Sequence, residues 1–227
     1  LGAMTSDVAL PRLEAMLADS DQRVIPAVLE SLVKLASPNA AAILLERLKV
    51  DDPVVRAAAA AGLGTLKPSG GAAALAEAYT FGQRDPSYNA RAAALGALVS
   101  YGLASAAPVL QTAFADKDWA LRVRAARLMA QLDPAAAANA AAQIRPAPTT
   151  LSADVYAASR LTNPTVSTQA YIETDRGTIQ VELAVLDAPL TVENFVALAR
   201  KGFFDGLSVH RVVPDFVVQD GDPRGDG

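Results

Sequence analysis

The sequence contains no cysteine and a single histidine, His210, in 227 residues. Without thiols the chain can form no disulfide, no zinc–thiolate site and no cysteine nucleophile. One imidazole excludes multi-histidine metal sites, and no constellation around His210 supports a Ser-His-Asp triad. The sequence therefore predicts no metal centre and no cofactor, and any chemistry must rest on other side chains.

Long apolar runs and an excess of positive charge are also absent. The 20 basic and 24 acidic residues give a formal net charge of −4 without a basic stripe, so we expect no nucleic-acid binding. No apolar run approaches the length needed to cross a bilayer, so we expect no membrane partner. No signal peptide is recognisable, and the compartment stays open. The opening residues Leu1–Met4 resemble a vector-derived junction, and we expect the natural N-terminus to be missing.

Small apolar residues are what the chain has in abundance. Hydrophobic residues make up 52% of the sequence and charged residues 19%, a balance that favours a folded chain over disorder. Much of the apolar share is alanine, which buries little area per residue. Close packing of helices must therefore hold such a chain together.

A repeated pattern occupies the first part of the chain. Each copy has an aspartate, a short gap, an apolar–basic pair, small residues and then leucine; the clearest runs from Asp52 through Val55-Arg56 to Leu63. The copy that begins at Asp21 lacks the arginine. The aspartates step by 31, 33 and 33 residues and are Asp21, Asp52, Asp85 and Asp118. Such regularity indicates a structural repeat.

Each copy follows another helical stretch, and the two together predict a helix pair. The preceding stretches cover residues 7–18, 40–49, 72–81 and 106–115. A single pair cannot bury its apolar face, whereas stacked pairs can. We interpret the aspartate as the N-cap of the second helix, and the arginine as a link to an aspartate of the neighbouring repeat.

The Val55-Arg56 pair and the alanine-rich stretch that ends in Leu63-Gly64 resemble HEAT repeats of the short type. The resemblance covers about residues 5–133, and one more helix is expected over residues 134–144. It implies an all-α solenoid domain over residues 5–144. Such a domain either binds a client or partner protein or serves as a spacer, and the sequence leaves both open.

Residues 145–168 are rich in proline and threonine and are interpreted as a linker, with a short helix around Ser152–Leu161 as one option. From Gln169 onward the pattern alternates. It predicts strands over residues 170–174, 178–183, 208–213 and 216–219. Between the second and third strands, a helix over residues 192–201 is expected, with Thr191 as its N-cap and Gly202 at its end.

Three linked stretches of this last segment resemble the cyclophilin family: Ala188–Phe195, Gly202–Gly206 and Val209–Pro223. The short link Gly202–Gly206 is similar to that of bacterial members. Asp215 and Asp220 stand where many relatives have glycine. The resemblance implies that residues 169–227 are the N-terminal part of a cyclophilin-like domain.

The family domain is a closed eight-stranded barrel, and we expect only about half of its strands here. The predicted fold is therefore multidomain: an all-α HEAT-like solenoid followed by a partial, incomplete β-barrel.

The resemblance also implies an activity, peptidyl-prolyl cis–trans isomerisation. The barrier to rotating the peptide bond is about 18–20 kcal/mol and arises from amide resonance, so no nucleophile or metal is required. The site must bind the twisted amide better than either planar isomer. The resemblance assigns Arg211 as the catalytic donor to the proline nitrogen, Phe216 and Val217 as the seat for the proline ring, and Gln219 as the hold on the substrate backbone. Val217 is smaller than the methionine common there, which implies a shallower pocket.

The alternation of side chains between the two faces of a strand does not by itself place these residues in one site. It puts Val217 and Gln219 on one face of a strand and Phe216 on the other, and only the resemblance brings the three together. By the same alternation His210 points away from Arg211, and we interpret it as structural.

Three functions compete. The leading hypothesis is a peptidyl-prolyl isomerase that acts on proline-containing polypeptides, with the helical repeats binding a client or partner. The alternative is a protein-binding scaffold whose truncated isomerase-like segment is inactive, and a third is a general chaperone. Because a barrel cut open lacks the opposite wall of its site, we expect this chain by itself to be weakly active or inactive.

Overall fold

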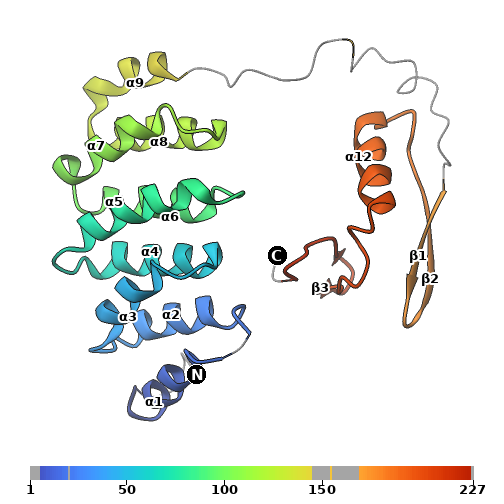
Figure 1. Ribbon diagram of the computed structural model, residues 1–227, viewed down its shortest axis with the longest axis horizontal. Coiled ribbons are helices and arrows are strands. Elements are labelled where there is room, and N and C mark those ends of the chain that lie inside the picture. The colour runs from blue at the N-terminus through green and yellow to red at the C-terminus, as the bar shows by residue number, and fades with distance from the viewer. Residues whose placement is uncertain (1–5, 20, 145–153, 155–168, 226–227) are drawn as a thin grey trace. The chain divides into compact units, whose positions relative to one another are not determined.

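The computed structural model describes residues 6–19, 21–144, 154 and 169–225. The chain divides into two compact units, Leu1–Ala147 and Pro148–Gly227 (Figure 1). Apart from Asp154, the predicted linker with its helix around Ser152–Leu161 lies outside the described residues. Within the part that is described, no helix is long and apolar enough to span a membrane.

The first unit is a stack of helix pairs. Figure 1 shows that the first helices of successive pairs form one layer and the second helices another, which confirms the predicted repeat of helix pairs. The first helices are α1 (Ser6–Met16), α3 (Ala40–Arg47), α5 (Gly71–Phe81) and α7 (Leu103–Ala113). The second helices are α2 (Ile25–Lys34), α4 (Pro53–Leu66), α6 (Asn89–Val99) and α8 (Trp119–Leu132). Short 3₁₀ turns accompany these helices: η1 (Gly82–Arg84) follows α5, and η2 (Pro134–Ala136) follows α8. The helix α9 (Ala137–Gln143) comes directly after η2.

Leucines and alanines alternate through the core between these layers. Leu63, Leu95 and Leu121 are fully buried, and alanines such as Ala59 and Ala94 lie between them. Because alanine and glycine have small side chains, neighbouring second helices approach closely. The alanine-rich composition therefore stabilises the unit through close packing of helices, as expected.

Aspartate–arginine pairs join consecutive repeats. Arg56 of α4 forms a buried ion pair with Asp85. Arg91 of α6 pairs with Asp116, and with Asp118 at 2.5 Å. The predicted link between an arginine and an aspartate of the next repeat is therefore present in the structure.

The predicted capping role holds for one of the four aspartates and is wrong for the other three. Asp21 precedes α2, but Val24 stands at the N-cap of that helix and no side chain caps it. Asp52 caps α4 by accepting hydrogen bonds from the backbone N–H groups of Val54 and Val55, at 2.8 and 3.1 Å. Asp118 occupies the N-cap position of α8 but makes no cap hydrogen bond, because its carboxylate accepts from Arg91. Asp85 follows η1, and Tyr88 stands at the N-cap of α6. Where a buried guanidinium reaches the aspartate, the ion pair replaces the cap.

Within residues 169–225 the second unit has two separate two-stranded antiparallel sheets and a helix. Strands β1 (Gln169–Thr174) and β2 (Gly177–Glu182) form a hairpin, and β3 (Arg211–Val213) pairs with β4 (Val217–Gln219). Between them lies α12 (Pro189–Arg200). The four strands follow the predicted order, although β3 is shorter than expected. No closed barrel is found among the described residues.

The start of α12 differs from the prediction. The helix begins at Pro189, with Ala188 at the N-cap position, so Thr191 lies inside the first turn. Proline suits the first helical position because its missing N–H has no intrahelical partner there. The C-terminal end is as predicted: Gly202 follows the last turn with a positive φ of 70°.

Candidate active site

The hairpin of β3 and β4 carries the residues that the sequence singled out. Its register pairs Arg211 with Gln219, Val212 with Val218, and Val213 with Val217. Cross-strand partners share a face, so Arg211, Gln219 and Val217 lie on one face of the hairpin.

Arg211 and Gln219 are directly bonded. Nη1 of Arg211 donates a hydrogen bond to Oε1 of Gln219 at 2.7 Å, and both side chains are exposed. Among the described residues Arg211 forms no ion pair. Its guanidinium is therefore anchored at one nitrogen, while its other N–H groups remain available to a bound group.

The two apolar residues of the predicted site, Val217 and Phe216, do not lie together as Arg211 and Gln219 do. Val217 is half-buried on the same face as Arg211. Phe216 lies in the turn before β4, and 78% of it is exposed. The structure thus brings Arg211, Gln219 and Val217 to one face and leaves Phe216 outside it, without a formed seat for a proline ring.

The turn of this hairpin explains one departure from the family pattern. Asp215 has a φ of +58°, in the left-handed region that favours glycine. Aspartate is among the few other residues that enter this region readily, because its short side chain can bond to nearby backbone. The turn therefore forms with aspartate at a position that would also suit glycine.

A hollow of about 990 Å³ lies elsewhere in the same unit, and sequence reasoning did not identify it. Its lining includes Tyr171 of β1, Phe195 of α12, and Phe204 and Val209 from the segments that follow. The rings of Phe195 and Phe204 stack with centroids 5.3 Å apart. The only signal in the sequence was the apolar face of the helix, which does not distinguish a core from a site.

His210 is half-buried, and its Nδ1 atom is buried with no hydrogen-bond partner in the part of the chain that the structure describes. No cluster of histidine, cysteine or carboxylate residues there could hold a metal ion.

Comparison with protein families gives two matches. Residues 169–227 match the family described as cyclophilin type peptidyl-prolyl cis-trans isomerase, and residues 1–64 match HEAT repeats. No solved structure matches the chain.

Curated relatives resemble only the C-terminal part. A peptidyl-prolyl cis-trans isomerase of Synechococcus elongatus is 53% identical over 60 residues, which is 26% of this chain and 41% of the relative. A peptidyl-prolyl cis-trans isomerase of Helicobacter pylori is 52% identical over 58 residues, 26% of this chain and 36% of the relative. Peptidyl-prolyl isomerase CWC27 of Cryptococcus neoformans is 46% identical over 66 residues, 29% of this chain and 13% of the relative.

These matches span less than half the length of each relative. The short link Gly202–Gly206 predicted a bacterial protein; the relatives come from bacteria and fungi alike, so this prediction is not confirmed. The matches do confirm both resemblances: residues 169–227 match the cyclophilin type peptidyl-prolyl cis-trans isomerase family, and residues 1–64 match HEAT repeats.

Proposed function

We propose that the protein catalyses cis–trans isomerisation of peptide bonds before proline in polypeptides, and that its helical repeats bind a client or partner protein. In this proposal residues 5–144 are the binding domain, residues 145–168 a linker, and residues 169–227 one side of a cyclophilin-like barrel. The observation that carries the proposal is the exposed guanidinium of Arg211, held by Gln219 at 2.7 Å within a segment that matches the isomerase family.

The chemistry follows from the electronic structure of the amide. Rotation about the C–N bond breaks the resonance and localises a lone pair on the proline nitrogen. A donor that meets this lone pair stabilises the twisted state more than either planar isomer, which lowers the barrier. In the proposed mechanism Arg211 is that donor, Gln219 orients it and contacts the substrate backbone, and Val217 and Phe216 contact the proline ring.

The test is an isomerisation assay with a short proline-containing peptide. Arg211→Ala is expected to lower kcat/KM about 100- to 1,000-fold, because one fixed donor at a developing charge is worth roughly 2.7–4 kcal/mol. Arg176→Ala is the matched control, since Arg176 lies in the turn between β1 and β2. Activity that is equal in the Arg211 variant and the control would overturn the assignment.

The 227-residue chain itself is expected to show weak catalysis or none, because its described strands form no closed barrel. The assay therefore uses the natural full-length protein beside this chain. Absence of catalysis in the full-length protein would favour the second candidate, a scaffold with an inactive isomerase-like segment. The stack of helix pairs favours that candidate, since stacked pairs bury their apolar faces against one another and need no catalysis to bind a partner.

A further inference from the structure

The second helices of the last three complete repeats carry charge of one sign only. Helices α4, α6 and α8 contain five arginines and no acidic residue; the arginines are Arg56, Arg91, Arg122, Arg124 and Arg127. The chain as a whole has a formal net charge of −4. The three helices themselves therefore carry only positive charge, although aspartates outside their bounds pair with Arg56 and Arg91.

Three of the five arginines serve the repeat itself. Arg56 and Arg91 form the buried ion pairs with aspartates of the next repeat. Arg122 donates from Nε to the backbone carbonyl of Asp116. Arg124 and Arg127 differ: both are exposed, and neither forms an ion pair or hydrogen bond within the part of the chain that the structure describes. Their charges are available to a partner.

These two arginines border a groove of about 420 Å³ between α6 and α8. Apolar side chains form much of its lining, among them Ala92, Leu121 and Leu128. A Cβ atom on Gly96 of α6 would lie 2.9 Å from Nη2 of Arg124. The missing side chain of Gly96 thus leaves the space in which the guanidinium of Arg124 lies against α6.

Two exposed aromatic residues belong to this region: Tyr88 lines the groove, and Trp119 directly precedes Ala120 of the lining in the sequence. Tyr88 precedes α6 and is 42% exposed, and Trp119 begins α8 and is 47% exposed. The ion pair of Arg91 with Asp118 places these two helix starts side by side and engages the aspartate. Tryptophan, tyrosine and arginine are the residues that most often dominate binding energy at protein interfaces.

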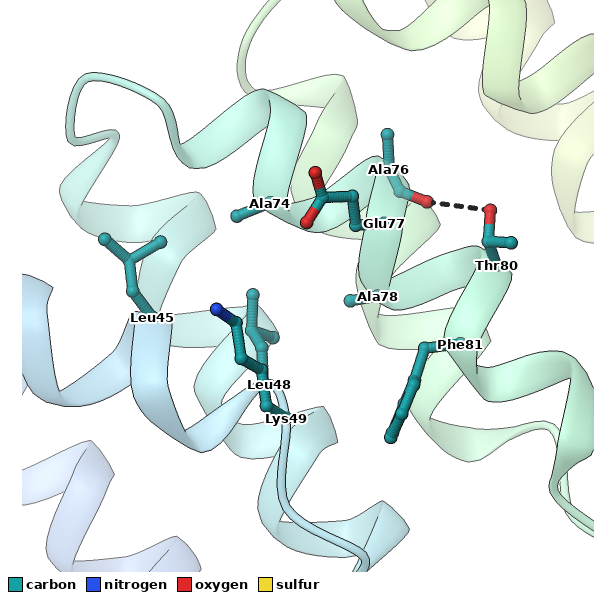
Figure 2. Close-up of a pocket in the computed structure, with 9 residues that line it drawn as sticks. All are labelled: Leu45, Leu48, Lys49, Ala74, Ala76, Glu77, Ala78, Thr80 and Phe81. Carbon is teal, nitrogen blue, oxygen red and sulfur yellow. Dashed lines mark hydrogen bonds between the residues drawn. The ribbon is translucent and has the colours of Figure 1, made fainter.

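A second groove, between α3 and α5, lacks this charge bias (Figure 2). Leu45, Leu48 and Phe81 line it, with Lys49 and Glu77 of opposite charge beside them. The guanidinium of Arg84 lies 3.8 Å from the centroid of the Phe81 ring and is itself paired with Asp51. The described lining of the groove between α3 and α5 therefore favours neither an acidic nor a basic partner.

We propose that the groove between α6 and α8 binds an acidic segment of a partner protein. Carboxylates of the segment pair with Arg124 and Arg127, and an apolar side chain enters the groove beside Tyr88. This inference rests on the proposed role of the helical repeats in binding a client or partner, and it names the surface and the chemistry. A nucleic acid is disfavoured, because only two free arginines face the groove of a chain with net negative charge.

Trp119 makes the proposal directly testable, because it is the only tryptophan in the chain. The probe is a synthetic peptide of repeated Asp-Leu-Glu triplets, and the matched peptide is Asn-Leu-Gln. Titration of the whole chain with the acidic peptide is expected to change the Trp119 emission saturably, with affinity that falls as salt screens the charges. The neutral peptide is expected to have little effect.

Charge reversal locates the site. Arg124→Glu with Arg127→Glu is expected to weaken binding of the acidic peptide on the order of tenfold or more, since two ion pairs become repulsions. The matched control reverses two exposed charges outside the groove, Arg12→Glu with Lys49→Glu. Circular dichroism checks that both variants keep their helix content.

Three results would overturn the proposal: equal binding of the neutral peptide, equal loss in the control variant, or binding of an oligouridylate in place of the acidic peptide. Failure here is distinguishable from failure of the proposed activity. Isomerisation of a short peptide depends on Arg211 and is expected to be unchanged in the variant with Arg124 and Arg127 reversed.

Discussion

At the scale of single residues, Asp116 has several side-chain partners within the helical unit. It is fully buried and accepts hydrogen bonds from Arg91, from the Tyr79 hydroxyl at 2.7 Å and from the Gln83 amide at 3.0 Å. Burial by itself would raise the pKa of Asp116, but the hydrogen bond from Arg91, with those of its other partners, reverses this and lowers it. Burial, together with the bond to Asp116, raises the pKa of Tyr79.

The lowered pKa of Asp116 predicts a loss of stability in acid. In the unfolded chain the carboxylate takes up a proton near its ordinary pKa of 3.8, whereas in the folded chain it resists protonation to lower pH. Its stabilising contribution is therefore fully present above that value and is lost as the pH falls through the folded pKa. Urea unfolding followed by circular dichroism between pH 7 and pH 3 measures the effect.

Asp116→Asn is the informative variant in that series. It is expected to lose stability at pH 7 toward the lower end of roughly 3–5 kcal/mol, because Arg91 keeps its pair with Asp118. Its stability should also fall less steeply in acid than that of the unaltered chain. Asp51→Asn is the control, since the Asp51 side chain is 98% exposed. Parallel pH profiles for the Asp116 variant and the unaltered chain would contradict the assignment.

At the scale of elements, the repeats are joined by close contacts at helix ends. Tyr101, just after α6, donates its hydroxyl to the backbone carbonyl of Leu63 near the end of α4, at 2.9 Å. The same hydroxyl lies 2.1 Å from where a Cβ atom would stand on Gly71, the first residue of α5. Three helices therefore meet at one tyrosine, and only glycine fits beside it.

Gly71→Ala is accordingly expected to destabilise the helical unit. The added methyl group displaces Tyr101, which costs about 1–3 kcal/mol for overpacking and includes loss of the hydrogen bond to Leu63. In a Tyr101→Ala background the same substitution should cost almost nothing. A double-mutant cycle of urea unfolding measures the coupling. Additive effects of the two substitutions would show that the contact does not limit packing.

At the scale of the whole molecule, the two units differ sharply in how much they bury. Most buried hydrophobic residues lie in the helical unit. Among the described residues of the second unit, only Val185 and Val192 are buried hydrophobic residues. Large apolar side chains such as Leu186 and Phe216 are 79% and 78% exposed. Residues 169–225 of the second unit thus bury few apolar side chains.

Hydrogen exchange should reflect this difference. Amides of α4 and α6 are expected to be strongly protected, because opening them exposes the leucine core of the stack. Amides of β1 to β4 should exchange much faster, since two-stranded sheets with little burial open readily. Mass spectrometry of peptides from the exchanged chain measures both. Equal protection of β2 and α4 would contradict this picture.

Much of this organisation could be predicted from the sequence. The helix pairs followed from the aspartate spacing, and the hairpins from the alternation within residues 170–174 and 178–183, because these signals depend on residues a few positions apart. What could not be predicted was which partner a side chain takes. Asp118 was expected to cap α8, but Arg91 takes its carboxylate.

The candidate site shows the same division. The sequence by itself determined that Arg211, Val217 and Gln219 belong to two adjacent strands, through local patterns and through the family motif. Only the tertiary structure decided that Gln219 holds Arg211, that Phe216 stays in the turn, and that Asp116, remote from Tyr79 in sequence, bonds to it. The physical reason is that local periodicity reports which face is apolar, whereas partners across helices and strands depend on how whole elements pack.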